Sequence, residues 1–145
     1  TGPLSLNSSR GSRVPVLGTS VGLAYIAHCS ITERENCFQQ VQNDPEPWNR
    51  IARDPSRSRS ELAKIRKQGF AVMSETYSSK EYENLVSSIG VPVMAGTKLF
   101  GAVNILYLKN TFSVTMAKKK LVRPLKVLSG QMATELARAF PDGVM

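Results

Sequence analysis

Histidine and cysteine are scarce in this sequence, which has one histidine, His28, and two cysteines, Cys29 and Cys37. Zinc sites and disulfide frameworks are built from clusters of these residues. We therefore expect the two cysteines to be reduced structural thiols, and we expect neither a metal nor another cofactor.

Long apolar runs are also lacking. The longest, such as residues 14–17 and 21–27, fall far short of the roughly 20 residues that cross a membrane. No signal-peptide pattern opens the chain. The sequence predicts a cytoplasmic protein with no membrane partner.

The composition is that of one globular domain, because 41% of the 145 residues are apolar and 21% are charged. Nineteen Lys and Arg residues against eleven Asp and Glu residues give a net charge of +8. Such a charge is found in nucleic-acid-binding domains, which stay open as an alternative function. The basic residues concentrate in residues 50–67 and 118–126, where they are also typical of the solvated faces of amphipathic helices.

The beginning of the chain predicts a strand followed by a helix. Residues 1–12 are rich in Ser, Gly and Asn and predict a flexible lead-in or a partial strand. Residues 14–17 are apolar and contain a proline, which favours an edge strand or the start of a strand. The following helix should be capped by Thr19 or Ser20 and should end near Cys29.

Two sequences with capping-box spacing predict the starts of the next helices. Thr32 with Glu35 predicts a helix that runs to about residue 42, and Ser58 with Glu61 predicts another that ends at Gly69. The proline-rich stretch between them should be a loop with at most one short helical turn.

The second half of the chain predicts strands and a long closing helix. Residues 70–73 should be extended, and residues 86–93 and 99–108 should form a hairpin whose connection contains a glycine. Apolar residues then recur at helical spacing and should form a buried stripe centred on Leu128 and Leu136: Leu121, Leu125, Leu128, Met132 and Leu136. Pro124 must lie in the first turn of this helix or kink it. The fold class is therefore predicted as α+β, an antiparallel sheet with helices packed on it.

Residues 18–22 match the G-x-S-x-G pattern that presents the nucleophile of serine hydrolases between a strand and a helix. A serine hydrolase that uses Ser20 is therefore an alternative. Such a serine needs a histidine base, but His28 lies about two helical turns further on, roughly 12 Å along the axis. We expect no catalytic residues and no enzymatic activity.

The same segment can instead receive an anion. The backbone N–H groups of Ser20, Val21 and Gly22 and the hydroxyls of Thr19 and Ser20 lie at the start of a helix, where a carboxylate is favoured. Helix capping alone is the competing interpretation.

Asn104 interrupts an apolar strand, and burying its amide without partners would cost roughly 1–3 kcal/mol. Strand alternation places Asn104 on one face with Ala102 and Leu106, while Ser88 shares a face with Gly90. If these faces coincide, Ser88 and Asn104 form a polar pair in an apolar cup. The pair then either contacts a ligand or is satisfied internally.

Residues 13–27, RVPVLGTSVGLAYIA, resemble the opening motif of IclR effector domains, a strand that enters a T-x-x-G-x-A-x-L-A helix. Further stretches resemble the family in the same order: residues 33–35, residues 62–71, the two central strands at 87–93 and 101–105, and residues 123–125. The resemblance covers residues 13 to about 139. Residues 74–85 depart from it, because they are longer and less acidic than the family's usual stretch.

The resemblance implies a GAF/PAS-like effector-binding domain over residues 13–140, without the family's winged helix-turn-helix and the first part of the effector domain. It implies a bacterial-type transcriptional regulator that senses a small organic or aromatic acid. Effector binding would alter the geometry of a homo-oligomer, a dimer or tetramer, and so DNA binding by the absent N-terminal domain. The expected ligand-binding residues are Thr19, Ser20, Val21, Gly22, Met73, Glu75, Ser88, Asn104 and Leu106.

The isolated chain is expected not to bind duplex DNA specifically, because its sequence contains no helix-turn-helix pattern with a recognition helix. An electrophoretic mobility-shift assay at physiological salt checks this. A shift that depends on DNA sequence would favour the nucleic-acid-binding alternative.

Overall fold

A three-stranded antiparallel sheet organises the fold. The computed structural model describes residues 10–142, so residues 1–9 of the lead-in predicted over residues 1–12 lie outside the described residues. The elements in chain order are α1 (Ser20–His28), α2 (Ile31–Val41), the 3-10 helix η1 (Pro47–Arg53), α3 (Pro55–Gln68), β1 (Ala71–Val72), α4 (Glu75–Tyr82), β2 (Val86–Ala95), β3 (Lys98–Leu108) and α5 (Val114–Ala139). The strand order is β1-β2-β3. None of the described helices is long and apolar enough to cross a membrane.

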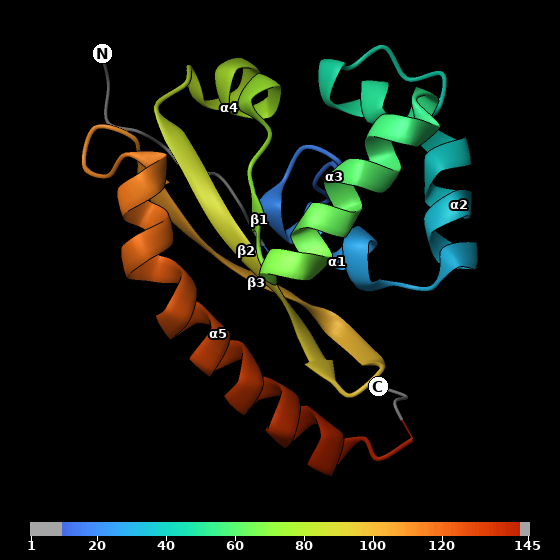
Figure 1. The fold of residues 1–145 in the computed structure, drawn as a ribbon, viewed down its shortest axis with the longest axis vertical. Coiled ribbons are helices and arrows are strands. Elements are labelled where there is room, and N and C mark those ends of the chain that lie inside the picture. The colour runs from blue at the N-terminus through green and yellow to red at the C-terminus, as the bar shows by residue number, and fades with distance from the viewer. Residues whose placement is uncertain (1–9, 143–145) are drawn as a thin grey trace.

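The sheet separates two groups of helices, with α5 along one side and α1 to α4 on the other (Figure 1). Side chains of β2 alternate between the two sides. Val86 packs in a core cluster with Leu17, Ile26 and Leu62, whereas Ile89 packs in a second cluster with Leu125. The predicted α+β architecture is confirmed.

The predicted hairpin is confirmed. Strands β2 and β3 pair Ser88 with Leu106 and Gly90 with Asn104, and they connect through a tight turn at Gly96. Gly96 has a φ of 62°, a backbone conformation that glycine adopts without strain. Asn104 lies two residues before Leu106, the partner of Ser88, and on the same face of the sheet. Ser88 and Asn104 therefore lie diagonally across the two strands.

The Val14–Leu17 segment is not a strand, contrary to the prediction. Thr19 donates from both its backbone N–H (3.2 Å) and its hydroxyl (2.8 Å) to the carbonyl oxygen of Pro15, which turns the chain into α1. The backbone of Val16 lies against Gly22 so closely that a Cβ there would be 2.2 Å from the Val16 oxygen. Local packing and hydrogen bonding against α1 therefore replace strand pairing.

Helix α2 begins before the predicted capping box. Ser30, and not Thr32, is the N-cap, and its hydroxyl accepts a hydrogen bond from the N–H of Glu33 at 3.1 Å. Ser30 and Glu33 have the same spacing as the predicted pair, Thr32 and Glu35. Spacing alone therefore could not show which of the two pairs caps the helix.

Helix α3 also begins earlier than predicted, at Pro55. A carboxylate oxygen of Asp54 accepts from the N–H of Arg57 at 3.1 Å, so Asp54 is the cap in place of Ser58. Proline favours this first position because its fixed φ suits the helix and its missing N–H is not needed there. The predicted end is confirmed, since Gly69 follows the helix in the left-handed conformation.

Helix α5 is the predicted long helix, but its buried stripe differs from the prediction. Its buried residues are Ala117, Leu125, Ser129 and Ala133. Leu125 is 1% exposed, whereas Leu128 is 48% exposed, so the prediction that Leu128 is buried was wrong. Pro124 lies inside the helix, whose axis changes direction along its length (Figure 1). A proline removes one helical hydrogen bond, which accounts for such a bend.

Leu125→Ala is expected to lower the free energy of unfolding by roughly 2–5 kcal/mol, because it leaves a cavity between α5 and the sheet. Leu128→Ala, three residues further on, is the matched control and should lower it by less than about 1 kcal/mol. Urea denaturation of both variants measures the difference. Equal losses would contradict the packing of α5.

Candidate functional site

Thr19 is the N-cap of α1. Its hydroxyl accepts a hydrogen bond from the Gly22 N–H at 3.1 Å while donating to Pro15. The Thr19 hydroxyl and the Gly22 N–H, both of which were expected to receive a ligand carboxylate, are therefore bonded within the chain. Thr19 has the role of a helix cap.

The first turn of α1 rests directly on the backbone of β2. A Cβ at Gly90 would lie 2.5 Å from the carbonyl oxygen of Ser20 and 3.0 Å from the nitrogen of Val21. Such distances leave room only for glycine. Gly90 was not among the predicted site residues, although a glycine within an apolar strand is a sign of close backbone approach.

Three polar side chains meet at this contact. The Ser20 and Ser88 hydroxyl oxygens are 2.5 Å apart, and the Asn104 amide nitrogen donates to the Ser20 hydroxyl at 3.3 Å. Ser20 and Ser88 are completely buried, and Asn104 is half-buried. Ser88 and Asn104 are therefore joined through Ser20 and not directly to each other. We call these three residues the polar cluster.

Some donors and acceptors of the polar cluster are not used in its internal hydrogen bonds. Only one of the two serine hydroxyl hydrogens is used in the Ser20–Ser88 bond, and only one of the two amide hydrogens of Asn104 points to Ser20. The amide oxygen of Asn104 makes no hydrogen bond with the residues that the structure describes. Two donors and the amide oxygen of Asn104 are thus unpaired among the described residues, and of the three side chains only that of Asn104 is partly exposed.

An apolar hollow of about 230 Å³ is lined by residues that neighbour the polar cluster in the chain, although Ser20, Ser88 and Asn104 do not line it themselves. Val21 and Gly22 of α1 and Ala102 of β3 line it, together with Val14, Val16 and Tyr25. Ala102 lies on the same face of β3 as Asn104. The hydroxyl of Tyr25 donates to the Glu33 carboxylate at 2.7 Å. This bond, burial and the Glu33 charge raise the pKa of Tyr25 to about 12, so the phenol is protonated at neutral pH.

The other predicted site residues lie in different surroundings. Met73 is buried in the core, and its N–H donates to the Ser88 carbonyl oxygen at 3.0 Å. Leu106 is 39% exposed and pairs with Ser88 across the hairpin. Glu75 begins α4, is exposed, and forms an ion pair with Lys109 at 2.9 Å. The structure brings Met73 and Leu106 next to Ser88, but Glu75 lines a different cavity.

Comparison with protein families identifies the chain. The model of the bacterial transcriptional regulator IclR C-terminal family matches residues 2–133. The chain belongs to this family. It is an effector-binding domain of the IclR type, and since the family consists of regulators it is not an enzyme.

Solved structures share the IclR fold. A protein of Rhodococcus sp. RHA1 described as a transcriptional regulator superposes with a TM-score of 0.75 and 20% identity, over 96% of this chain and 55% of its own. IclR of Thermotoga maritima superposes with a TM-score of 0.67 and 24% identity, over 93% of this chain and 53% of its own. The PobR inducer binding domain from Acinetobacter superposes with a TM-score of 0.66 and 18% identity, over 90% of this chain and 75% of its own. The chain thus spans about half the length of the first two proteins.

Ser20 does not have the surroundings of a serine-hydrolase nucleophile within the described residues. Ser20 is buried and bonded to Ser88 and Asn104, and a ring nitrogen of His28 is bonded to the Ala24 carbonyl oxygen at 2.7 Å. In the described part of the chain, no base therefore hydrogen-bonds to Ser20. Between residues 10 and 142, no group of three or more His, Cys, Asp or Glu could hold a metal ion. Cys29 and Cys37 are free thiols, and burial raises the pKa of both.

Gly90→Ala is expected to lower the free energy of unfolding by roughly 1–3 kcal/mol or more, because the new methyl group would overlap the backbone of α1. Gly101→Ala in β3 is the control, since a Cβ there meets no atom within 4 Å. Thermal and urea unfolding of the two variants check this. A Gly90→Ala protein as stable as Gly101→Ala would contradict the close contact of α1 with β2.

Proposed function

We propose that this domain senses a small organic acid, whose carboxylate binds at the polar cluster of Ser20, Ser88 and Asn104. The observation that carries the proposal is that the Ser20 hydroxyl joins α1, β2 and β3 at one point and leaves donors unused. A carboxylate accepts hydrogen bonds from such donors, and bonds that involve an ionised group are the stronger ones. The pairing of Ser88 with Leu106 and of Gly90 with Asn104 supports the proposal, because it puts Ser88 and Asn104 on one face of the sheet.

The apolar body of the acid would occupy the hollow lined by Val21, Gly22 and Ala102. Ligand sites commonly combine apolar walls with a few polar groups that fix orientation. In this proposal Met73 and Leu106 flank Ser88, whereas Thr19 acts as the helix cap and Glu75 takes no part. A double mutant of the PobR inducer binding domain was solved as a complex with 3-hydroxybenzoic acid, and this supports the choice of an aromatic acid as a candidate.

The bound acid would act on the arrangement of subunits. A ligand shifts a conformational equilibrium only as far as it binds the states unequally. Because the polar cluster ties a helix to two strands, a ligand inserted there would change how α1 sits on the sheet. We propose that this change alters a dimer or tetramer, and through it DNA binding by another part of the full-length regulator.

A thermal-shift screen of benzoate, 3-hydroxybenzoate and short aliphatic acids identifies the effector class. An acid at a hundredfold excess over its Kd should stabilise the domain by about 2.7 kcal/mol. If none of these acids stabilises the domain, the proposal is wrong for this class of ligand.

Asn104→Leu should retain the fold but bind the acid found in the screen about 1–3 kcal/mol more weakly, because a polar group of the ligand loses its partner. Ser88→Ala should have the same effect in milder form. Ser79→Ala, an exposed serine in α4, is the control and should bind as the wild type does. Isothermal titration calorimetry measures the affinities. Unchanged affinity in a folded Asn104→Leu protein would place the site elsewhere.

A further inference from the structure

A second cavity, of about 440 Å³, lies where α3, η1, α4 and the start of α5 surround β1. It shares no lining residue with the hollow lined by Val21, Gly22 and Ala102. Its volume falls within the range of roughly 300–1,000 Å³ that is usual for small-molecule sites. The cavity is therefore large enough to hold a ligand of its own.

The inner wall of this second cavity is apolar. Its apolar lining residues are Leu17, Leu23, Trp48, Ile51, Ile65 and Val72. Trp48 packs edge-on against Tyr77, with 5.1 Å between the ring centroids, and the Lys80 ammonium lies 5.6 Å from its ring. These contacts hold an aromatic side chain in place at the cavity wall, where it can pack against an apolar ligand group.

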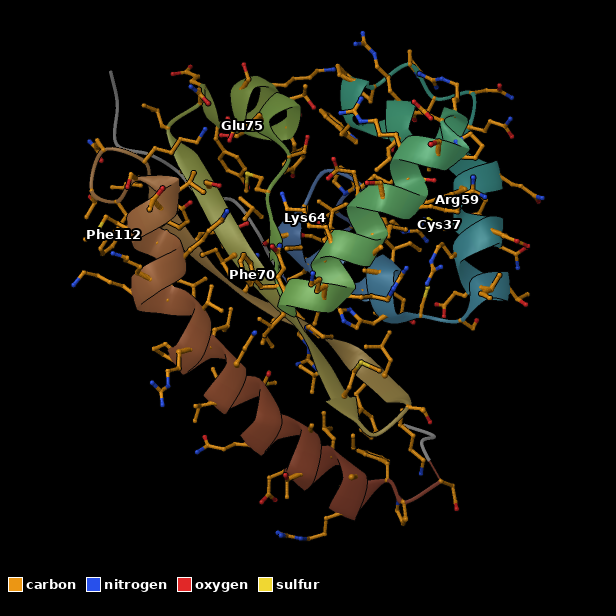
Figure 2. All side chains as sticks on the ribbon, viewed as in Figure 1. Cys37, Arg59, Lys64, Phe70, Glu75 and Phe112 are labelled. Carbon is orange, nitrogen blue, oxygen red and sulfur yellow. The ribbon has the colours of Figure 1, made fainter. Side chains whose placement is uncertain are left out.

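The border of the cavity carries charged side chains from two helices. Arg57, Glu61 and Lys64 follow one another at intervals of four and three residues, which places them on one side of α3. Lys118 comes from α5 and lies 5.9 Å from the centre of the Phe70 ring. Lys64 projects from α3 and Glu75 from α4 (Figure 2).

The cations at this border form no ion pairs among the described residues. Among the described residues, Arg57, Lys64 and Lys118 have no ion-pair partner, whereas the Glu75 carboxylate is paired with Lys109. Glu61 is then the one lining carboxylate without such a partner in residues 10–142. Three cations against one carboxylate give the border a positive potential that attracts an anion.

We propose that this second cavity binds a small organic anion, a carboxylate joined to an apolar body, as a site separate from the polar cluster. The carboxylate would contact Arg57, Lys64 and Lys118, and the apolar body would pack against Trp48. An arginine and two lysines can pair with a carboxylate by charge-assisted hydrogen bonds.

Trp48 is the only tryptophan of the chain, so its fluorescence reports on this cavity. We expect 3-phenylpropionate to change the emission saturably. The neutral analogue 3-phenylpropan-1-ol has the same ring and chain, and it should bind at least tenfold more weakly because it lacks the charge. No saturable change with the acid, or equal binding of the alcohol, would overturn the proposal.

Two matched lysine variants test the border. Lys64→Met should raise the Kd of 3-phenylpropionate about tenfold, since it removes one charge and keeps the length of the side chain. Lys67→Met, on the same helix but outside the cavity lining, should leave the Kd unchanged. Equal Kd values in the two variants would overturn the assignment.

Asn104→Leu separates the two sites. It alters the polar cluster and should leave the Trp48 titration unchanged. Loss of the fluorescence change in this variant would show that the acid acts from the polar cluster, which would overturn the second site and support the first. Persistence of the change in Asn104→Leu, together with the raised Kd of Lys64→Met, would support the second site whatever the fate of the first.

Discussion

The direct backbone contact between the first turn of α1 and β2 at Gly90 is the constraint on which the rest of the site depends. It brings the Ser20 hydroxyl within reach of two strands and so creates the polar cluster. The other end of α1 is held by charge. Arg34 donates to the carbonyl oxygens of Ile26 (2.9 Å) and Cys29 (3.2 Å), which satisfies acceptors that a helix end leaves free. Both ends of α1 are thus fixed by contacts to its backbone.

Much of this arrangement could be predicted because its signals are local. Alternation in the two long strands gave the hairpin and its faces, and the polar Asn104 in an apolar strand indicated that partners must be near. The predicted starts of α2 and α3 were wrong because Ser30 and Asp54 compete with other caps only a few residues away. The exposure of Leu128 depends on how α5 crosses the sheet, and the spacing of apolar residues within the helix does not reveal this.

The site itself was predicted in part. Strand alternation and family resemblance together led to Ser88 and Asn104, yet the need for a glycine at position 90 follows from the backbone of Ser20 and Val21, about 70 residues earlier in the sequence. The second cavity could not be predicted, because its wall comes from segments scattered between Leu17 and Lys118. In the sequence, the basic residues of α3 look like an ordinary solvated helix face.

The buried row of α5 has a mechanical consequence. Ala117, Leu121, Leu125, Ser129 and Ala133 recur every four residues, with Leu121 half-buried. At 3.6 residues per turn each step advances about 40° around the axis, so the row winds by about 160° from its first residue to its last. Different sides of the helix therefore touch the twisted sheet at its two ends. As in a screw, translation of α5 along the strands and rotation about its own axis cannot occur independently while this packing is kept.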